Sequence, residues 1–323
     1  MKRSNLVRAI AVAATLMAAA VLAENYPSRP VRLIVPFAPG GTTDIIARVV
    51  TSRVQPNFGE PMVVENRAGA GGVIGANETA KAVPDGYILG VATVSTVATA
   101  PVMQPNVPYD PLTDFTPIIN IAATPNVIEV NPSFPARDYK GFIAELKKNP
   151  DKYSYASTGT GSITHMQMEL FKAQTGTSIL HVPYKGAGPA LSDVLAGQVP
   201  ILLDNLPSSL PYIKLGRLIP IVVAADKRVA ALPDVPTLAE VGLPTVNRVA
   251  FYGIYGPKGL PKEVVAKVHD AVKQTLDDPQ VRARIEDTGS TIVGNTPEQF
   301  AQQIKAEYEV YKGLAEAQHL KPE

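Results

Sequence analysis

Near its N-terminus the chain reads Val31-Arg32-Leu33-Ile34-Val35-Pro36-Phe37-Ala38-Pro39-Gly40-Gly41-Thr42-Thr43-Asp44. The first five residues are mostly β-branched or aliphatic, which favours a short strand. The glycine pair then breaks the strand, and the residues from Asp44 to about Val54 carry the pattern of a helix. A strand that passes through a glycine loop into a helix is typical of α/β folds.

The same order of strand and helix repeats along the rest of the chain. Short β-rich runs alternate with helix-forming segments as far as Ala224, and the three helices expected from Pro261 onward each carry a proline near the first turn. This alternation predicts an α/β fold with a mostly parallel sheet in each domain. With 323 residues, the chain is long enough for about two such domains.

Two longer extended runs stand apart from the short ones. They cover residues 118–130 and 248–255, and they could carry the chain from one lobe to the other and back. Such a path predicts a discontinuous first lobe, made of residues 24–124 and 249–323, with a second lobe of residues 125–248 inserted between its halves.

The first 23 residues have the pattern of an export signal. Three basic residues precede an apolar run from Ala9 to Ala23, which is shorter than the roughly 20 residues that a membrane span needs. The alternative, an N-terminal membrane anchor, is disfavoured by that short run. We therefore expect residues 1–23 to be a cleaved signal peptide and the mature chain to be a soluble protein of the periplasm.

Composition and motifs exclude several classes of protein. The 30 Lys and Arg residues against 29 Asp and Glu leave a net charge of +1, which argues against a nucleic-acid binder. The chain has no Cys, so zinc–thiolate sites and iron–sulfur clusters are excluded. No complete GxGxxG, phosphate-loop Gly-Lys-Ser/Thr, GxSxG or HExxH motif occurs. We expect no catalytic residue, no metal and no cofactor.

Two glycine-rich loops carry the chemical signal. Residues 36–44 and 156–165 each follow an expected strand and open an expected helix. The start of a helix presents unpaired backbone N–H groups and the positive end of the helix dipole. Glycine lets the backbone approach a ligand closely, and Ser and Thr hydroxyls add donors. Two such loops, one in each lobe, predict a site that holds one anion across a cleft.

A set of motifs spread over the whole mature chain resembles the Bug-type solute receptors, which are the extracytoplasmic substrate-binding proteins of tripartite tricarboxylate transporters. The motifs are residues 26–41 with Asp44, Glu65-Asn66-Arg67-Ala68-Gly69-Ala70-Gly71-Gly72, Pro84-Asp85-Gly86-Tyr87, Val182-Pro183-Tyr184-Lys185-Gly186, Asp204-Asn205-Leu206-Pro207, and Asp234-Val235-Pro236-Thr237 with Glu240.

This resemblance implies a two-lobed periplasmic binding fold, expected to be monomeric, that closes on its ligand and works with the membrane subunits of such a transporter. Family ligands are small organic acids: acidic amino acids, di- and tricarboxylates, nicotinate and aromatic acids. The resemblance also implies that both loops hold a ligand carboxylate, partly through ordered waters. The implied ligand-binding residues are Phe37, Ala38, Gly40, Thr42, Thr43 and Asp44 in the first loop, and Ser157, Thr158, Gly159, Gly161, Ser162 and His165 in the second.

Asp204 is a further candidate ligand-binding residue. It follows the β-rich run at residues 199–203, so it is expected at the carboxyl end of a strand, where α/β proteins form their ligand crevices. A carboxylate there favours a ligand ammonium group, which makes glutamate or aspartate the first ligand hypothesis. The alternative is that Asp204 caps the next helix or fixes the loop. His165 likewise has a packing or capping alternative.

An exported α/β enzyme that acts on a carboxylate is the competing hypothesis. In that case Asp44 or His165 would serve as the base. The sequence offers no nucleophile–base pair in a recognisable motif, which favours a receptor that is not an enzyme.

Overall fold

The computed structural model describes residues 26–320. The expected signal peptide, residues 1–23, lies outside the described residues. Within residues 26–320, the helices all fall short of the length or the apolar character that a bilayer crossing requires.

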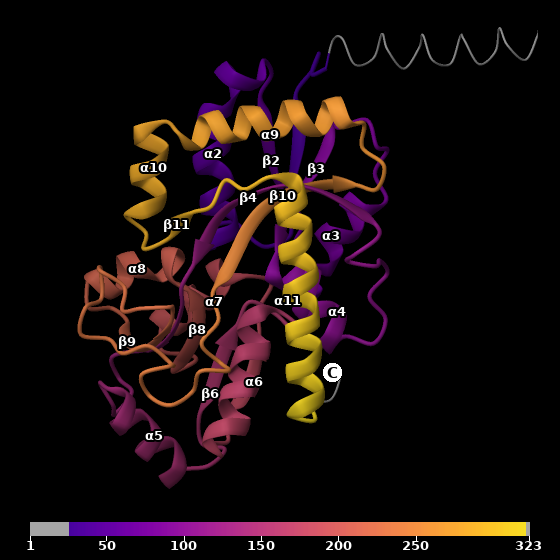
Figure 1. Ribbon diagram of the computed structural model, residues 1–323. Coiled ribbons are helices and arrows are strands. Elements are labelled where there is room, and N and C mark those ends of the chain that lie inside the picture. The colour runs from indigo at the N-terminus through magenta and orange to yellow at the C-terminus, as the bar shows by residue number, and fades with distance from the viewer. Residues whose placement is uncertain (1–25, 321–323) are drawn as a thin grey trace, which may run out of the picture.

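Two sheets lie at the centres of two lobes, one above the other in Figure 1. The first sheet has the strand order β11-β4-β10-β3-β1-β2, and the second has the order β7-β6-β8-β5-β9. The strands of the first sheet are β1 (Val31–Val35), β2 (Met62–Asn66), β3 (Ile88–Thr93), β4 (Phe115–Thr124), β10 (Ala250–Pro257) and β11 (Thr291–Ile292). Those of the second are β5 (Asn126–Val130), β6 (Ser154–Ser157), β7 (Leu180–Pro183), β8 (Ile201–Asn205) and β9 (Ile219–Ala224).

Helices alternate with these strands. In the first lobe they are α2 (Thr42–Phe58), α3 (Val73–Ala80), α4 (Ala100–Met103), α9 (Lys262–Leu276), α10 (Pro279–Glu286) and α11 (Pro297–Ala317), with the short segments η1 (Ala70–Gly72) and η2 (Ser95–Thr99). In the second lobe they are α5 (Tyr139–Lys148), α6 (Ile163–Thr175), α7 (Ala187–Leu195) and α8 (Leu206–Lys214). Prolines stand at the first turns of α10 and α11, as the sequence predicts.

Both sheets are mixed, so the prediction of mostly parallel sheets is wrong in this detail. The pairs β1–β2, β1–β3, β6–β7 and β6–β8 are parallel. However, β10 is antiparallel to both β3 and β4, and β5 is antiparallel to both β8 and β9. In the first sheet, β10 and the short β11 run against the other strands. In the second sheet, β5 runs against the other strands. Two of these three, β5 and β10, are the strands at which the chain enters the second sheet and returns to the first.

The chain passes from the first sheet to the second through a single residue. The extended run at 118–130 is two strands, because β4 ends at Thr124 and β5 begins at Asn126. Pro125 stands between them, and its missing N–H cannot continue a ladder of hydrogen bonds. The second passage follows β9 and ends where β10 begins, at Ala250.

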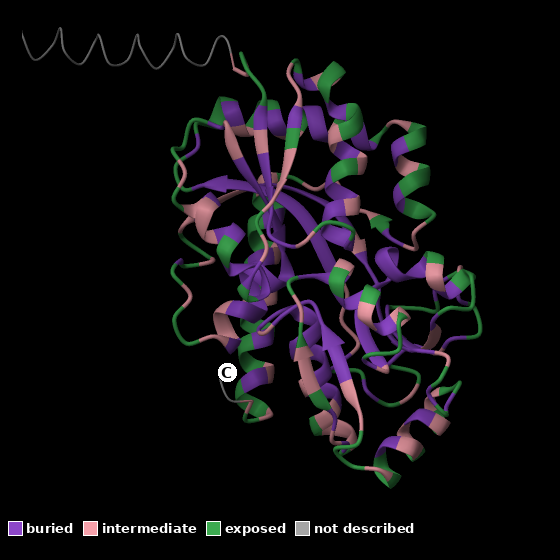
Figure 2. Cartoon of the chain, turned by 180° about the vertical axis from the view of Figure 1, so that it is seen from behind, coloured by how far each residue is buried: buried purple, intermediate pink, exposed green. Residues whose placement is uncertain are grey.

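The central strands of both sheets are buried under helices, while the edge strands β2 and β7 and the outer helix faces are partly exposed (Figure 2). Every residue of β5, β8 and β10 is buried. Residues that follow the carboxyl ends of β1, β3, β6, β7 and β8 meet in one space between the lobes. In α/β proteins this edge of the sheet is where ligands bind.

Candidate functional site

A cavity lies between the two lobes at this edge. It leaves a space of about 20 Å³ for water, which is enough for about one water molecule. The first lobe contributes Phe37, Gly41, Thr42, Thr43, Thr93, Val94, Ser95, Ala250, Phe251 and Tyr252, and the second contributes Thr158, Ile163, Ala187 and Asn205. Since none of these side chains is charged, the recognition of an ion here has to rest on backbone groups and hydroxyls.

The first glycine-rich loop places the start of α2 at the cavity. Gly41 is the N-cap residue and has no side chain with which to satisfy the helix. Among the described residues, no protein group accepts a hydrogen bond from the backbone N–H of Thr42 or Thr43. These free donors and the positive end of the helix dipole make this wall of the cavity suited to an anion.

Asp44 holds the first loop in shape. Its carboxylate accepts hydrogen bonds from the Gly40 N–H at 3.1 Å, from Asn66 Nδ2 at 3.0 Å and from Arg48 Nε at 3.0 Å. Burial alone would raise the pKa of Asp44, but the bonds from Arg48, Asn66 and Gly40 bring it below its ordinary value. With both oxygens occupied and no place in the cavity wall, Asp44 positions the loop.

A second helix start in the first lobe was missed by sequence reasoning. The chain leaves β3 at Thr93 and enters the helical segment of η2 and α4, so that Thr93, Val94 and Ser95 line the cavity. Thr93 and Thr96 fix this turn with reciprocal bonds from backbone N–H to side-chain oxygen at 3.1 and 3.2 Å. The turn contains no glycine, so nothing in its composition marks it as a ligand loop.

The second glycine-rich loop uses many of its donors internally. The N–H groups of Thr158 and Gly159 donate to Thr164 Oγ1 and Ser157 Oγ, and that of Gly161 donates to His165 Nδ1 at 3.1 Å. At the start of α6, the His165 N–H is capped by Ser162 Oγ and the Ile163 N–H donates to Ser95 Oγ of the other lobe. The loop therefore offers the cavity fewer free N–H groups than the sequence suggests.

His165 lies behind the second loop, away from the cavity wall. Its ring stacks on that of His181 with 4.0 Å between centroids, and Ser157 Oγ lies 2.6 Å from His181 Nε2. Burial lowers the pKa of His165 to about 4; Glu169 opposes this shift and Lys172 adds to it, each by less than burial. Its imidazole is therefore neutral at pH 7 and accepts the Gly161 N–H, a role that shapes the loop.

Asp204 lies one step behind the cavity wall. It is fully buried at the end of β8, and its Oδ2 accepts a hydrogen bond from Ser208 Oγ at 2.6 Å. Ser208 Oγ in turn lies 2.9 Å from Thr42 Oγ1 of the first lobe, and Thr42 Oγ1 also donates to the Asn205 carbonyl at 3.1 Å. A chain of hydroxyls thus joins the buried carboxyl to the cavity.

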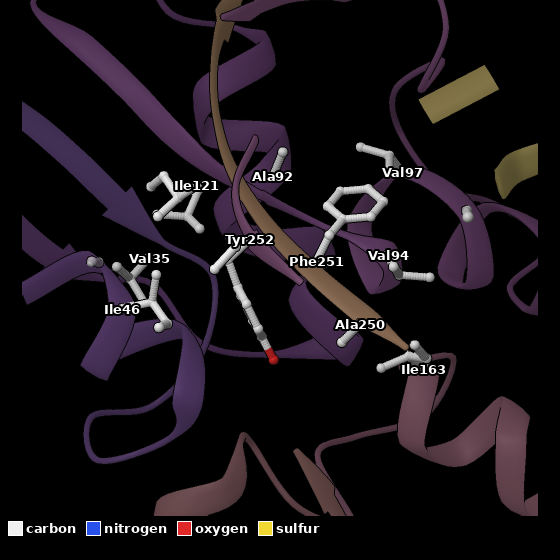
Figure 3. Close-up of a cluster of buried hydrophobic side chains, with 14 of the residues drawn as sticks. Val35, Ile46, Ala92, Val94, Val97, Ile121, Ile163, Ala250, Phe251 and Tyr252 are labelled. Atoms are coloured by element: carbon white, nitrogen blue, oxygen red, sulfur yellow. The ribbon is translucent and has the colours of Figure 1, made fainter. Parts of the chain in front are cut away.

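Tyr252 supplies a phenol at the cavity. It is 2% exposed, it comes from the middle of the first sheet on β10, and its oxygen points toward the second lobe (Figure 3). Burial, with a smaller contribution from Asp204, raises the pKa of Tyr252 well above its usual range. The hydroxyl is therefore protonated at neutral pH and is available as a donor.

Four of the predicted ligand-binding residues line the cavity and nine do not. Those in the wall are Phe37, Thr42, Thr43 and Thr158. Those outside it are Ala38, Gly40, Asp44, Ser157, Gly159, Gly161, Ser162, His165 and Asp204. The wall residues that were missed are Gly41, Thr93, Val94, Ser95, Ile163, Ala187, Asn205, Ala250, Phe251 and Tyr252. Gly186-Ala187-Gly188 and Asp204-Asn205 are motifs that could have indicated two of them.

The lobes touch directly around the cavity. Three hydrogen bonds cross from the first lobe to the second at the cavity rim. The Ala38 N–H donates to the Lys185 carbonyl at 3.0 Å, Thr99 Oγ1 to the Gly161 carbonyl at 2.8 Å and Gln104 Nε2 to the Thr160 carbonyl at 2.8 Å. The structure therefore shows the two lobes closed over the site.

Comparison with known families identifies the chain. A sequence profile described as "tripartite tricarboxylate transporter family receptor" matches residues 46–320. The chain belongs to this receptor family. It is a solute-binding receptor of the Bug type, as its motifs predicted, and the α/β fold with two lobes is confirmed.

Individual relatives agree with this. Protein BugT of Bordetella pertussis is 36% identical over 306 residues, which cover 94% of each chain. MatC of Rhodopseudomonas palustris, solved with bound malate, superposes with a TM-score of 0.87 at 33% identity and covers 90% of this chain and 99% of its own. Another R. palustris protein, solved with adipate, gives a TM-score of 0.88 at 34% identity over 92% of this chain and 100% of its own.

Proposed function

We propose that this receptor captures a small dicarboxylate in the cavity between its lobes and delivers it, chemically unchanged, to the membrane subunits of a tripartite transporter. One observation carries the proposal. The start of α2, with free N–H groups on Thr42 and Thr43, faces the cavity between the lobes, whose wall contains hydroxyls and no charged side chain. Such a wall favours an anion, and it has no carboxylate that would repel one. The free space of about 20 Å³ is too small for a dicarboxylate, so the cavity has to widen when it admits the ligand.

A plain dicarboxylate is the first candidate, and glutamate or aspartate is the second. The amino-acid hypothesis needs Asp204 to receive an ammonium group. However, Ser208 separates Asp204 from the cavity, and burial raises the pKa of its carboxyl to about 7, which weakens its attraction for a cation. MatC and the other R. palustris protein, both similar to this chain, were solved with malate and with adipate, which are dicarboxylates without an amine.

An enzymatic role has less support. The candidate bases, Asp44 and His165, are both occupied by hydrogen bonds that hold the loops, and neither lines the cavity. Within residues 26–320, no group of three or more His, Asp or Glu side chains is arranged to hold a metal ion. We further propose that the receptor is exported to the periplasm with loss of residues 1–23. Its lobes would comprise residues 24–124 with 249–323, and residues 125–248.

Comparing glutarate with glutamate tests the ligand class, because the two differ by one ammonium group. We expect calorimetric titration to show tighter binding of glutarate, and the Asp204→Asn variant to leave the order of the two unchanged. If glutamate bound more tightly and lost this preference in Asp204→Asn, an acidic amino acid would become the first ligand candidate. If no member of a panel of malate, glutarate, adipate, glutamate, aspartate and nicotinate raised the melting temperature, the proposed function itself would fail.

Removing the Tyr252 hydroxyl should weaken binding without unfolding the protein. The hydroxyl is a neutral donor in a desolvated cavity, and the loss of such a bond to a charged group corresponds to about 1.5–3 kcal/mol. We therefore expect Tyr252→Phe to raise the Kd for a bound dicarboxylate about tenfold or more. Tyr255→Phe is the matched control, since Tyr255 is buried on the same strand but does not line the cavity. Equal effects of both changes would show that the Tyr252 hydroxyl does not contact ligand.

A further inference from the structure

Two carboxyl groups lie buried together beside the cavity. Glu129 on β5 and Asp204 on β8 are both 0% exposed. In the antiparallel register Val127 is opposite Asp204 and Glu129 is opposite Leu202, so the two acids occupy diagonal positions on one face of the sheet. Apart from Asp204 Oδ2, their carboxyl oxygens have no partner at hydrogen-bond distance among the described residues. Ser209 and the Asn205 backbone lie near enough to lower the pKa of Glu129 and of Asp204, but less than burial raises them.

The surroundings of this acid pair, Glu129 and Asp204, contain no compensating cation. The helices α7 and α8 cover this face with Ala190, Leu191, Val194, Ser208, Ser209 and Leu210. From the first lobe, Thr42 and Tyr252 approach, and Tyr252 is the titratable side chain that interacts with Asp204. The charged group that interacts with Glu129 is Asp204 itself. No Lys, Arg or His of residues 26–320 acts on either carboxyl.

Two negative charges in such a place are unfavourable, because burial removes their solvation and each repels the other. Burial accordingly raises the pKa of Glu129 well above its ordinary range, with Asp204 adding to the shift, and raises that of Asp204 to about 7. The pair thus holds at least one proton at neutral pH. Asp204, whose pKa is the lower of the two, is the carboxyl that gains or loses the second proton near pH 7.

The pair is coupled to the cleft through Ser208 and Thr42. Ser208 Oγ bonds Asp204 on one side and lies 2.9 Å from Thr42 Oγ1, across the lobe boundary, on the other. Asn205, the residue after Asp204, lines the cavity. If the lobes part, water would reach Asn205 and Ser208 and help to solvate a charged Asp204. When they close over an anion, that water leaves and a further negative charge is brought near.

We propose that the acid pair Glu129–Asp204 is a proton-binding site which takes up a proton as the lobes close on a dicarboxylate. The inference rests on the proposed function, because the coupling needs an anionic ligand in the cavity. Closure raises the proton affinity of Asp204, so by linkage protons favour the closed, liganded form. Affinity is therefore greatest at low pH. It falls as the pH rises through the range in which the open form has lost its proton and the closed form still holds it, and it levels off once the closed form loses its proton.

Calorimetric titration with L-malate and with adipate measures this proton directly. At pH 7.0–8.0 both carboxylates of each probe are ionised, so the probes themselves bring no proton. The titrations are run in phosphate, MOPS and Tris, which differ in ionisation enthalpy. When the observed binding enthalpy is plotted against the ionisation enthalpy of the buffer, the slope gives the number of protons that the complex takes up. We expect a positive slope of up to about one proton and a Kd that rises by up to about tenfold per pH unit. Asp204→Asn, which keeps an acceptor for Ser208, should abolish the slope.

Three further variants make the result decisive. Asp204→Ser removes the same carboxyl and should also abolish proton uptake at pH 7.5, so the test stands even if Asp204→Asn does not fold. Glu129→Gln imitates the protonated glutamate and should keep the uptake. Asp234→Asn changes an exposed aspartate of the same lobe and should leave uptake unchanged. Tight binding with zero slope in the unmodified protein would overturn the inference and leave the proposed function standing. A slope retained in the Asp204 variants would do the same. Absence of binding by both probes would overturn the two together.

Discussion

Replacing Gly188 with alanine will weaken ligand binding about tenfold to a hundredfold while leaving the protein folded. In the closed structure, a Cβ on Gly188 of the second lobe would lie 2.3 Å from the carbonyl oxygen of Pro39 of the first lobe. Overpacking of this kind typically costs about 1–3 kcal/mol. The two residues belong to different lobes, so the steric penalty falls on the closed form of the protein. In the open form, alanine is tolerated in the first turn of α7, apart from a mild backbone restriction before Pro189.

Calorimetry gives the affinity, and small-angle scattering with saturating dicarboxylate shows whether the lobes close. The unmodified protein should become more compact on binding, and Gly188→Ala should do so less. Gly141→Ala is the control, because it also adds a methyl group to a helix but meets its nearest neighbour at an ordinary 3.4 Å. Full affinity and full compaction in Gly188→Ala would contradict the closed geometry.

Asp204→Asn will change how stability depends on pH in the ligand-free protein. Because the folded pKa of Asp204 is about 7 against an ordinary 3.8, the folded state holds the proton more tightly than the unfolded chain. Its contribution to stability is therefore complete below about pH 4 and is lost as the pH rises through about 7. Between pH 5 and 8 this loss amounts to about 3 kcal/mol, which makes it one of the largest single effects expected here.

Urea unfolding at pH 5, 6, 7 and 8 gives the free energy of unfolding of the variant and of the unmodified protein. The difference between the two at each pH measures the contribution of Asp204. The difference is needed because His165, whose folded pKa of about 4 is below the ordinary 6.5, adds stability as the pH rises over part of the same range. Relative to the unmodified protein, Asp204→Asn should gain about 3 kcal/mol in its free energy of unfolding from pH 5 to pH 8. Parallel pH curves for the two proteins would show that the buried carboxyl is not protonated.

Glycine and proline signals made the first loop and most element boundaries predictable. β1 ends at Val35, directly before Pro36, and α2 begins at Thr42 after the glycine pair, two residues before the Asp44 start that the sequence indicates. Two features of the site could not be read in this way. The turn at Thr93–Ser95 has no glycine, and its place at the cavity depends on β3 lying beside β1 in the first sheet. Tyr252 reaches the cavity because β10 returns between β3 and β4, a pairing that no local pattern encodes.

The second loop shows why a correct local pattern gave an incomplete site. Its glycines do permit a tight turn, and Gly159 and Gly161 have φ of 130° and 75°. The donors that the turn creates are taken by Ser157, Thr164 and His165, which are close to it in sequence. Sequence spacing predicts that a helix start will be near a ligand, but whether its N–H groups stay free depends on which side chains fold back onto it.

A crystal structure of the receptor with the tightest-binding dicarboxylate of the panel tests the central claim most directly. One ligand carboxylate should lie in the cavity between the lobes, within about 3 Å of the backbone N–H groups of Thr42 and Thr43 at the start of α2. A ligand held elsewhere, such as in the larger groove at the lobe junction that includes Lys227 and Arg228, would contradict the account.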